Sequence, residues 1–290
     1  MQQNKEISAL FHLIDDPDQE VFDTVSDKIL HYGKEIIPNL EDLWEHTLEE
    51  TVQERIELLI HRVHYQDLQA GFRSWRQQPD LLQGALLMAR YQFPDFSVSQ
   101  VRNEIDKIKR NIWLELNNYL TPLEQVNVLN SMVYSYFGIK GTEISYQHRN
   151  HFFINQVIES RKGNPVTIGI LYQVLCEMLD LPVYAVNIPR QFILGYFDLP
   201  AADMGGSAGT ASSHARFYID PLQGQIYTPK DVEVYLKRIS MVPDSAYFHP
   251  LDNRQIISTL LEEAAKCFTA EKEAYKYEEL LSLSALVAEE

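Results

Sequence analysis

The sequence is poor in cysteine and in basic residues, and its first residues do not form a secretory signal. Its 290 residues include two cysteines, Cys176 and Cys267, which fall in two separate helical patterns. A disulfide framework is therefore not expected, and a reducing compartment fits better. The N-terminus lacks a basic segment followed by an apolar one. We therefore expect a cytoplasmic protein.

Acidic residues outnumber basic ones, 41 to 25, and the formal net charge at pH 7 is −16. Such a charge repels nucleic-acid phosphates and anionic membrane surfaces. The most basic stretch, residues 107–110, lies beside Glu104 and Asp106 in an amphipathic pattern that is typical of a solvated helix face. We therefore expect neither a nucleic acid nor a membrane as a partner.

The histidine and glycine patterns do not predict a metal or a cofactor. Glu57, His61 and His64 share a helix face through i+4 and i+3 spacing, and His148 and His151 are three residues apart. Neither group offers a full set of ligands at a recognised spacing, so ordinary surface histidines are the favoured interpretation. The sequence also contains no glycine-rich phosphate loop. We expect no metal and no cofactor.

Residues 161–180 are the segment around which the chain is organised. Asn164 is a favourable N-cap, and Pro165 suits the first helical position, where its missing N–H costs nothing. Apolar residues then occupy nearly every side of the helix: Val166, Ile168, Ile170, Leu171, Tyr172, Val174, Leu175, Met178 and Leu179. Such a helix belongs in a protein core, since Gln173 and Glu177 leave it too short and too polar to cross a membrane.

The chain before this segment shows helical periodicity. Residues 14–33 and 48–63 carry similar apolar patterns, offset by about 35 residues, a period found in helical solenoids. Two interpretations fit equally well: a pair of HEAT-like repeats, or a plain helical subdomain. Further helices are expected over residues 79–93, 98–116 and 123–137.

After the central segment the apolar period changes from 3.6 to 2, which indicates strands. Residues 183–188, 191–197 and 215–220 are strand-like, and residues 226–227 suggest a short fourth strand. Residues 201–213 form a long loop of Gly, Ala and Ser, which suits a lid or a tolerated insertion. Residues 254–268 and 271–288 predict an antiparallel pair of helices.

Six segments between residues 80 and 220 resemble the transglutaminase-like core family of bacterial proteins, which often carry C-terminal tetratricopeptide repeats. They are DLLQGALLMARYQFP (80–94), YFGIKG (136–141), residues 150–157, SRKGNPVTIGILYQVLCEMLDLP (160–182), VNIPRQFILGY (186–196) and YIDP (218–221). Each segment alone is a weak signal, but their combination and order are specific. The resemblance implies a papain-like fold with one helix packed on a small sheet.

We therefore expect an α+β protein in three parts. Residues 1–66 form a helical part, residues 67–250 the transglutaminase-like core with its leading helices and small antiparallel sheet, and residues 251–290 a C-terminal helical hairpin.

The resemblance also implies a Cys-His-Asp triad, of which this chain retains one member. The nucleophilic Cys would stand at the start of the central helix, but residues 163–167 contain none. Gln191 occupies the position of the His, and an amide cannot accept a proton near neutral pH. Asp220 matches the orienting acid, although an Asp before a Pro is at least as typical of a turn.

Other residues do not replace the missing groups. Thr167 has a hydroxyl in the first helical turn, and a hydrogen bond at the helix start is its favoured role. Cys176 and Cys267 lie on packing faces, where a buried thiol is expected. The sequence thus predicts a pseudoenzyme, a non-catalytic interaction or regulatory protein that binds a peptide or protein segment in a degenerate cleft.

The residues predicted to form that cleft are Asn164, Pro165, Thr167, Gln191 and Asp220. The alternative is an acyl-transfer or amide-hydrolysing enzyme with an unrecognised nucleophile. Catalysis of that kind requires a nucleophile and a base within about 3 Å of each other.

Overall fold

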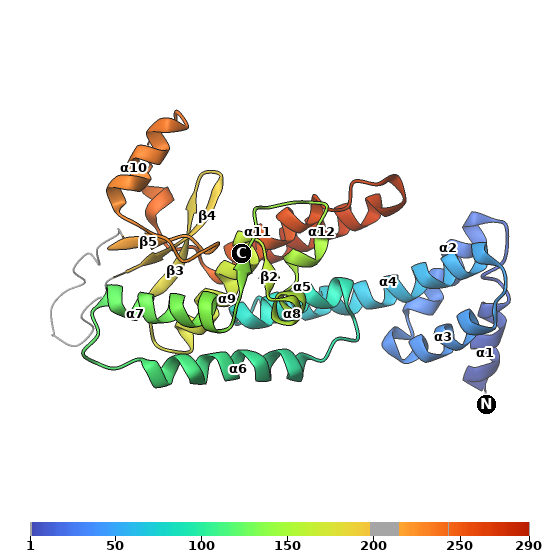
Figure 1. Ribbon diagram of the computed structural model, residues 1–290. Helices are drawn as coiled ribbons and strands as arrows, with labels where there is room; N and C mark the ends of the chain where they lie inside the picture. The colour runs from blue at the N-terminus through green and yellow to red at the C-terminus, as the bar shows by residue number, and fades with distance from the viewer. Residues whose placement is uncertain (1, 198–214, 243, 290) are drawn as a thin grey trace. The chain divides into compact units, whose positions relative to one another are not determined.

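The computed structural model describes residues 2–197, 215–242 and 244–289, in two compact units, Met1–Ser74 and Trp75–Glu290 (Figure 1). The loop predicted as a lid or insertion, residues 201–213, lies outside the described residues. None of the helices in the described ranges combines the length and apolarity needed to span a bilayer.

The first unit is helical. Its elements are α1 (Gln2–Phe11), α2 (Gln19–Leu30), η1 (Gly33–Ile36), α3 (Ile37–His46) and α4 (Glu50–Trp75), the last of which continues into the second unit. The side chain of Asp18 caps α2 by accepting a hydrogen bond from the Glu20 N–H at 2.9 Å. Apolar residues of the two similar sequence patterns, Val25 and Ile29 with Ile56 and Leu59, pack into one buried cluster. Their description as HEAT-like repeats stays a prediction.

The second unit begins with helices that surround the central one. They are α5 (Leu81–Gln92), α6 (Val98–Glu115), α7 (Pro122–Asn130), η3 (Arg149–Phe152) and α8 (Ile154–Ser160). The sequence predicted a helix over residues 123–137, and helical structure does run from Pro122 to Tyr136, although only its first part is α-helical. The α-helix ends at Asn130 and a π-helical stretch, Ser131–Tyr136, follows it. π-Helical turns are invisible to a 3.6-residue apolar period.

The central helix is α9 (Pro165–Glu177), which begins where Asn164 and Pro165 predict. Every residue from Val166 to Cys176 is buried. The helix contacts α5, α8 and α11 as well as strands of the sheet, so it has no solvent-facing side. Burial of this apolar helix therefore contributes to the stability of the second unit, because apolar burial dominates folding energetics.

The sheet is antiparallel, with strand order β3-β4-β5-β6. Its strands are β3 (Val183–Ile188), β4 (Gln191–Tyr196), β5 (Phe217–Ile219) and β6 (Ile226–Tyr227). All four were expected, although β5 is shorter than residues 215–220. Ile188 pairs with Gln191 in the β3–β4 hairpin, and Tyr196 pairs with Phe217 across β4 and β5. This register places the first residue of β4 beside the hairpin turn.

The sequence did not predict the second, two-stranded sheet of the structure. β1 (Lys140–Gly141) pairs in parallel with β2 (Lys162–Gly163), immediately before the start of α9. Two-residue strands carry no alternation that a sequence pattern could reveal. The Gly141 N–H donates to the Leu222 carbonyl oxygen at 3.1 Å, so this small sheet holds the turn after β5.

The chain continues through α10 (Pro229–Arg238) and η4 (Ser245–Phe248) to a helical pair, α11 (Asn253–Ala265) and α12 (Ala274–Ala288). These last two helices pack on each other, as the hairpin prediction requires. Arg149 makes two hydrogen bonds to Glu273, of 2.9 and 3.3 Å, and so ties η3 to the start of the pair's second helix. The expected α+β fold class is thereby confirmed.

Candidate functional site

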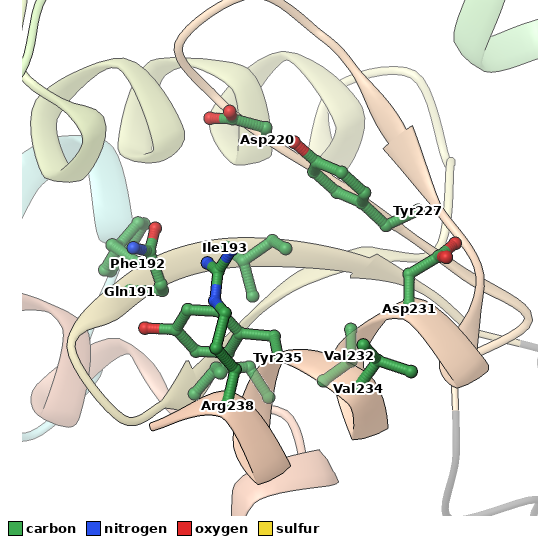
Figure 2. A pocket seen from close by; sticks show the side chains of 11 residues that line it. Gln191, Phe192, Ile193, Asp220, Tyr227, Asp231, Val232, Val234, Tyr235 and Arg238 are labelled. Atoms are coloured by element: carbon green, nitrogen blue, oxygen red, sulfur yellow. The ribbon is translucent and has the colours of Figure 1, made fainter. Parts of the chain in front are cut away.

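A pocket of about 400 Å³ lies between β4, the end of β5 and α10. Figure 2 shows the lining side chains on β4, on the segment that carries Asp220 and Tyr227, and on α10. The lining combines apolar and polar groups: Ile188, Gln191, Phe192, Ile193, Asp220, Tyr227, Asp231, Val232, Val234, Tyr235 and Arg238. Two of the five residues predicted to form a cleft, Gln191 and Asp220, therefore face one pocket.

The β3–β4 hairpin positions Gln191. Arg190 precedes it in a left-handed backbone conformation, φ +64°, which closes the tight turn from Ile188. Gln191 is the first residue of β4, and its side chain is exposed at the mouth of the pocket. Its amide can donate and accept hydrogen bonds there but cannot act as a general base.

Asp220 directly follows β5 and shapes a turn. Its Oδ1 accepts a hydrogen bond from the Leu222 N–H at 2.8 Å, and its carbonyl oxygen accepts one from the Gly224 N–H at 2.8 Å. Gly224 has φ +72°, a conformation that favours glycine. The carboxylate of Asp220 thus serves as a turn former and also lines the pocket. The sequence left open whether Asp220 forms a turn or orients a catalytic His, and the turn is the role that these hydrogen bonds show.

The helix α10 supplies the opposite wall. Thr228 and Asp231 form a capping box at its start, and the hydrogen bonds from Thr228 lower the pKa of the Asp231 carboxyl. The Tyr235 hydroxyl donates to the Pro189 carbonyl oxygen at 3.1 Å, which fixes the helix against the β3–β4 turn. The Arg238 guanidinium lies 5.6 Å from the centre of the Tyr235 ring.

The pocket has a negative side and a positive side. Burial raises the pKa of Tyr227, and the carboxylates of Asp220 and Asp231 raise it further. Arg238, at the other side, forms no ion pair with any described residue. A ligand can therefore accept hydrogen bonds from Arg238 and donate them toward Asp220.

Asn164 and Thr167 lie elsewhere, inside the protein. Both are 0% exposed, and the Asn164 Oδ1 accepts hydrogen bonds from the Thr167 N–H at 2.9 Å and from the Thr167 hydroxyl at 3.3 Å. The hydroxyl thus makes a hydrogen bond at the helix start. Pro165 is half-buried and, like the other two, is not among the residues lining the pocket. The structure does not bring these three residues into the pocket with Gln191 and Asp220.

Neither cysteine is set up as a nucleophile. Cys176 is fully buried in α9, and burial, reinforced by the charge of Glu177, raises its pKa well above the usual range. Burial also raises the pKa of Cys267 to about 11, although Arg149 opposes that shift. Because the thiolate is the reactive form, both thiols are poor nucleophiles at neutral pH.

One hydroxyl–imidazole pair went unnoticed in the sequence. The Thr142 Oγ1 lies 3.1 Å from Nδ1 of His151 and 3.2 Å from the Gly163 carbonyl oxygen, next to the start of α9. Burial lowers the pKa of His151, and the nearby His148 and Lys162 lower it further, which favours the neutral imidazole. Thr142 directly follows β1 and His151 lies in η3. No periodic pattern in the sequence indicates that these two residues meet.

Among the described residues, no group of three His, Cys, Asp or Glu side chains is arranged to hold a metal ion. Glu57, His61 and His64, which share a face of α4 by sequence spacing, are therefore not arranged as metal ligands in the described part of the chain.

A model of a known protein family matches most of the second unit. The family model described as the transglutaminase-like superfamily matches residues 99–262. That range contains α9, the whole described sheet, the pocket-lining residues and the Thr142–His151 pair. More than half of the chain is thus covered by one family description.

Three curated relatives match the chain at low identity. YchA of Escherichia coli (strain K12) is 24% identical over 186 residues, which cover 63% of this chain and 64% of that protein. SirB1 of Salmonella typhimurium is 24% identical over 196 residues, 67% of this chain and 68% of that protein. F-box only protein 21 of Homo sapiens is 24% identical over 202 residues, 60% of this chain but 31% of that protein.

The match to the Escherichia coli relative therefore spans slightly less than two thirds of its length. No solved structure matches the chain.

Proposed function

The chain belongs to the transglutaminase-like superfamily. Starting from this membership, we propose that it binds an extended peptide segment of a partner protein in the pocket between β4 and α10, without catalysing a reaction there. The observation that carries the proposal is the placement of Gln191 and Asp220 in one pocket with Tyr235 and Arg238. A proton acceptor is missing from the Gln191 position, whereas groups for binding are present.

The lining suits an apolar anchor with a polar rim. Ile188, Ile193 and Val232 are buried apolar residues of the lining, and the pocket volume of about 400 Å³ accommodates one large side chain. Around them, Arg238 only donates hydrogen bonds, Asp220 only accepts them, and Gln191 does both. An extended backbone presents C=O and N–H groups in alternation, so it can satisfy all three.

Arg238 is the group expected to contribute most to affinity. Its guanidinium lies over Tyr235, and arginine and tyrosine are both enriched among residues that dominate binding energy. Because no described residue forms an ion pair with it, a partner's carbonyl or carboxylate does not have to displace an existing one.

The test begins with selection of random linear peptides on the intact chain, followed by fluorescence anisotropy with the selected peptides. We expect Arg238→Glu to weaken binding at least about tenfold, equivalent to about 1.4 kcal/mol. The matched control is Lys237→Glu, the same charge reversal one residue earlier on α10, at an exposed position outside the lining. Equal affinity for the two variants, or selection of no saturable binder, would refute the proposal.

A second candidate function is acyl-transfer or amide-hydrolysing catalysis by the Thr142–His151 pair. The 3.1 Å separation meets the geometric requirement for a nucleophile and its base. Against it, the Thr142 hydroxyl can donate instead to the Gly163 carbonyl, and no described carboxylate hydrogen-bonds His151 to orient it.

One experiment distinguishes the two candidate functions, peptide binding and catalysis. Hydrolysis of generic esters and amides is measured for the unaltered chain, Thr142→Val and His151→Gln. Turnover that both variants abolish, while peptide binding at the Arg238 pocket is unaffected, supports the enzyme. Absence of turnover in all three chains leaves peptide binding as the function that the pocket supports.

A further inference from the structure

The C-terminal end of α6 exposes large apolar side chains. The helix uses a different stripe for packing in the core, formed by Val101, Ile105, Ile108 and Ile112. Trp113 and Leu114, which follow that stripe, are 63% and 71% exposed. Tyr119 and Leu123 are also exposed, in the segment that leads from α6 into α7 (Figure 1). Residues 113–123 therefore concentrate exposed apolar side chains in one short stretch of the chain.

Trp113 differs from the other two tryptophans of the chain. The indole N–H of Trp44 donates to the Glu57 Oε1 at 3.0 Å, and that of Trp75 donates to the Asp80 carbonyl oxygen at 2.7 Å. The Trp113 N–H has no acceptor among the described residues, and its ring faces solvent. Tryptophan is enriched in the centres of protein interfaces, where it contributes strongly to affinity.

Basic side chains flank this apolar surface on α6. Lys107, Lys109 and Arg110 lie within the preceding two turns, and residues 107–114 include no acidic residue, although the chain as a whole has a net charge of −16. Helical spacing of three and four places Arg110 beside both Trp113 and Leu114. The apolar side chains are thus bordered by positive charge in an otherwise acidic protein.

Interactions within the chain leave most of this positive charge available. Lys109 and Arg110 form no ion pair with any described residue. The Arg110 Nε donates to the Asp106 carbonyl oxygen at 3.3 Å, which leaves its terminal N–H groups for a partner. Lys107 lies 3.6 Å from Glu104, but such an exposed pair contributes little to stability.

The helix dipole does not account for these basic residues either. The last turn of α6 contains no Lys, Arg or His, and the favourable effect of a cation at a helix end fades beyond that turn. The chain therefore gains little of its own stability from the charges at residues 107–110. A binding partner with negative charge is the remaining physical use for them.

The net charge of −16 disfavours three other occupants of this surface. Nucleic acids and anionic membranes are repelled by it, and two copies of the chain repel each other. A helix on a membrane surface also inserts its apolar stripe into the lipid, whereas the stripe of α6 is buried in the protein. An acidic protein segment meets the basic residues without those costs.

We propose that the exposed end of α6 is a docking surface for an acidic amphipathic segment of a partner protein. Trp113 and Leu114 contact the apolar residues of that segment, and Lys109 and Arg110 contact its carboxylates. The surface shares no residue with the lining of the pocket between β4 and α10. Neither proposal requires the other.

The test starts with selection on the intact chain from a library of short amphipathic peptides. Their apolar positions are Leu or Phe, and their polar positions are Glu or Lys at equal frequency. Peptides that no longer bind a Trp113→Ser chain are retained. We expect these peptides to be rich in Glu and to bind saturably in fluorescence anisotropy. Arg238→Glu, which alters the other pocket, should leave their affinity unchanged.

Variants with matched controls then assign the contacts. We expect Arg110→Glu and Leu114→Ser each to weaken binding at least about tenfold. The control for charge is Arg73→Glu on α4, the same reversal at an exposed position of the first unit. The control for the apolar change is Leu48→Ser, also exposed in that unit. Because all four side chains are exposed, the variants should keep the melting temperature of the unaltered chain.

Several results would overturn the proposal. Selection of no saturable binder is one, and an equal content of Glu and Lys in the selected peptides is another. Equal affinities of Arg110→Glu and Arg73→Glu would remove the role of charge. Tighter binding to phosphatidylglycerol vesicles or to oligo(dT), lost in Trp113→Ser, would reassign the surface to a membrane or a nucleic acid. A dimer in sedimentation equilibrium that Leu114→Ser abolishes would reassign it to a second copy of the chain.

Discussion

The ring of Phe192 on β4 lies directly against Gly169 on α9. A Cβ added at position 169 would stand 2.4 Å from Cε1 of that ring, a separation that real Cβ atoms do not show. The absence of a side chain at Gly169 is therefore what lets the sheet approach the central helix. Because Phe192 also lines the pocket beside Gln191, this contact links the core to the candidate site.

The first prediction concerns this contact. Gly169→Ala should lower the free energy of unfolding by about 1–3 kcal/mol, since overpacking a filled core forces side chains or backbone to shift. Urea unfolding of the variant measures the loss. Phe192→Leu in the same chain removes ring atoms and should restore part of the stability, whereas additive losses in the double variant would show that the two residues do not interact.

The second prediction tests the central helix itself. Leu175 is fully buried in α9, so Leu175→Ala should cost about 2–5 kcal/mol, through lost burial and a residual cavity. Leu114→Ala on α6 is the control, because Leu114 is 71% exposed and its truncation should change stability by less than about 0.5 kcal/mol. Equal melting temperatures for the two variants would contradict the role of α9 as core.

The sequence was sufficient for features that local chemistry determines. Asn164 and Pro165 mark the start of α9 because capping and proline geometry act within a few residues. The apolar residues that follow predicted burial correctly, since a helix that is apolar on all sides has no favourable exposed orientation. The change of period at Val183 located the sheet for the same local reason.

Features that depend on contacts distant in sequence could not be predicted. The wall formed by Tyr235 and Arg238 joins the pocket only because Tyr235 reaches the Pro189 carbonyl, 46 residues away. The Thr142–His151 pair likewise depends on the loop geometry around β1. The grouping of Asn164 and Thr167 with Gln191 rested on their alignment at one helix start, whereas their side chains turn into the core.

The third prediction concerns the thiols. With the pKa of Cys267 raised to about 11, only about one thiol in 10,000 is ionised at pH 7. Its alkylation rate should rise about tenfold per pH unit between pH 7 and 10, because the thiolate is the nucleophile. Cys176 should remain unmodified throughout while the chain is folded. Intact mass spectrometry after timed iodoacetamide exposure measures both rates.

Denatured chain provides the control for this experiment, since both thiols should then react at ordinary rates. Any amide hydrolysis or amine incorporation by the folded chain should also be unaffected by alkylation. Rapid modification of Cys176 at neutral pH, accompanied by loss of such activity, would show that the helix opens to expose a working nucleophile.

The last prediction separates the two roles of Asp220. Asp220→Asn keeps an oxygen that can accept the Leu222 N–H, whereas Asp220→Ala removes it. We expect the Ala variant to lose about 0.5–1.5 kcal/mol of unfolding free energy in urea, and the Asn variant to lose less. Both variants lack the carboxylate, so both should bind a selected peptide more weakly if that charge meets the ligand.

The comparison of the two variants decides between these roles. Normal peptide affinity in the Asn variant, with loss only in the Ala variant, would mean that Asp220 acts on the pocket solely by shaping the turn. Equal loss in both variants would assign the carboxylate a direct contact with the peptide. The turn has additional support from Tyr134, whose hydroxyl donates to the Pro221 carbonyl oxygen at 2.9 Å, so neither substitution should unfold the chain.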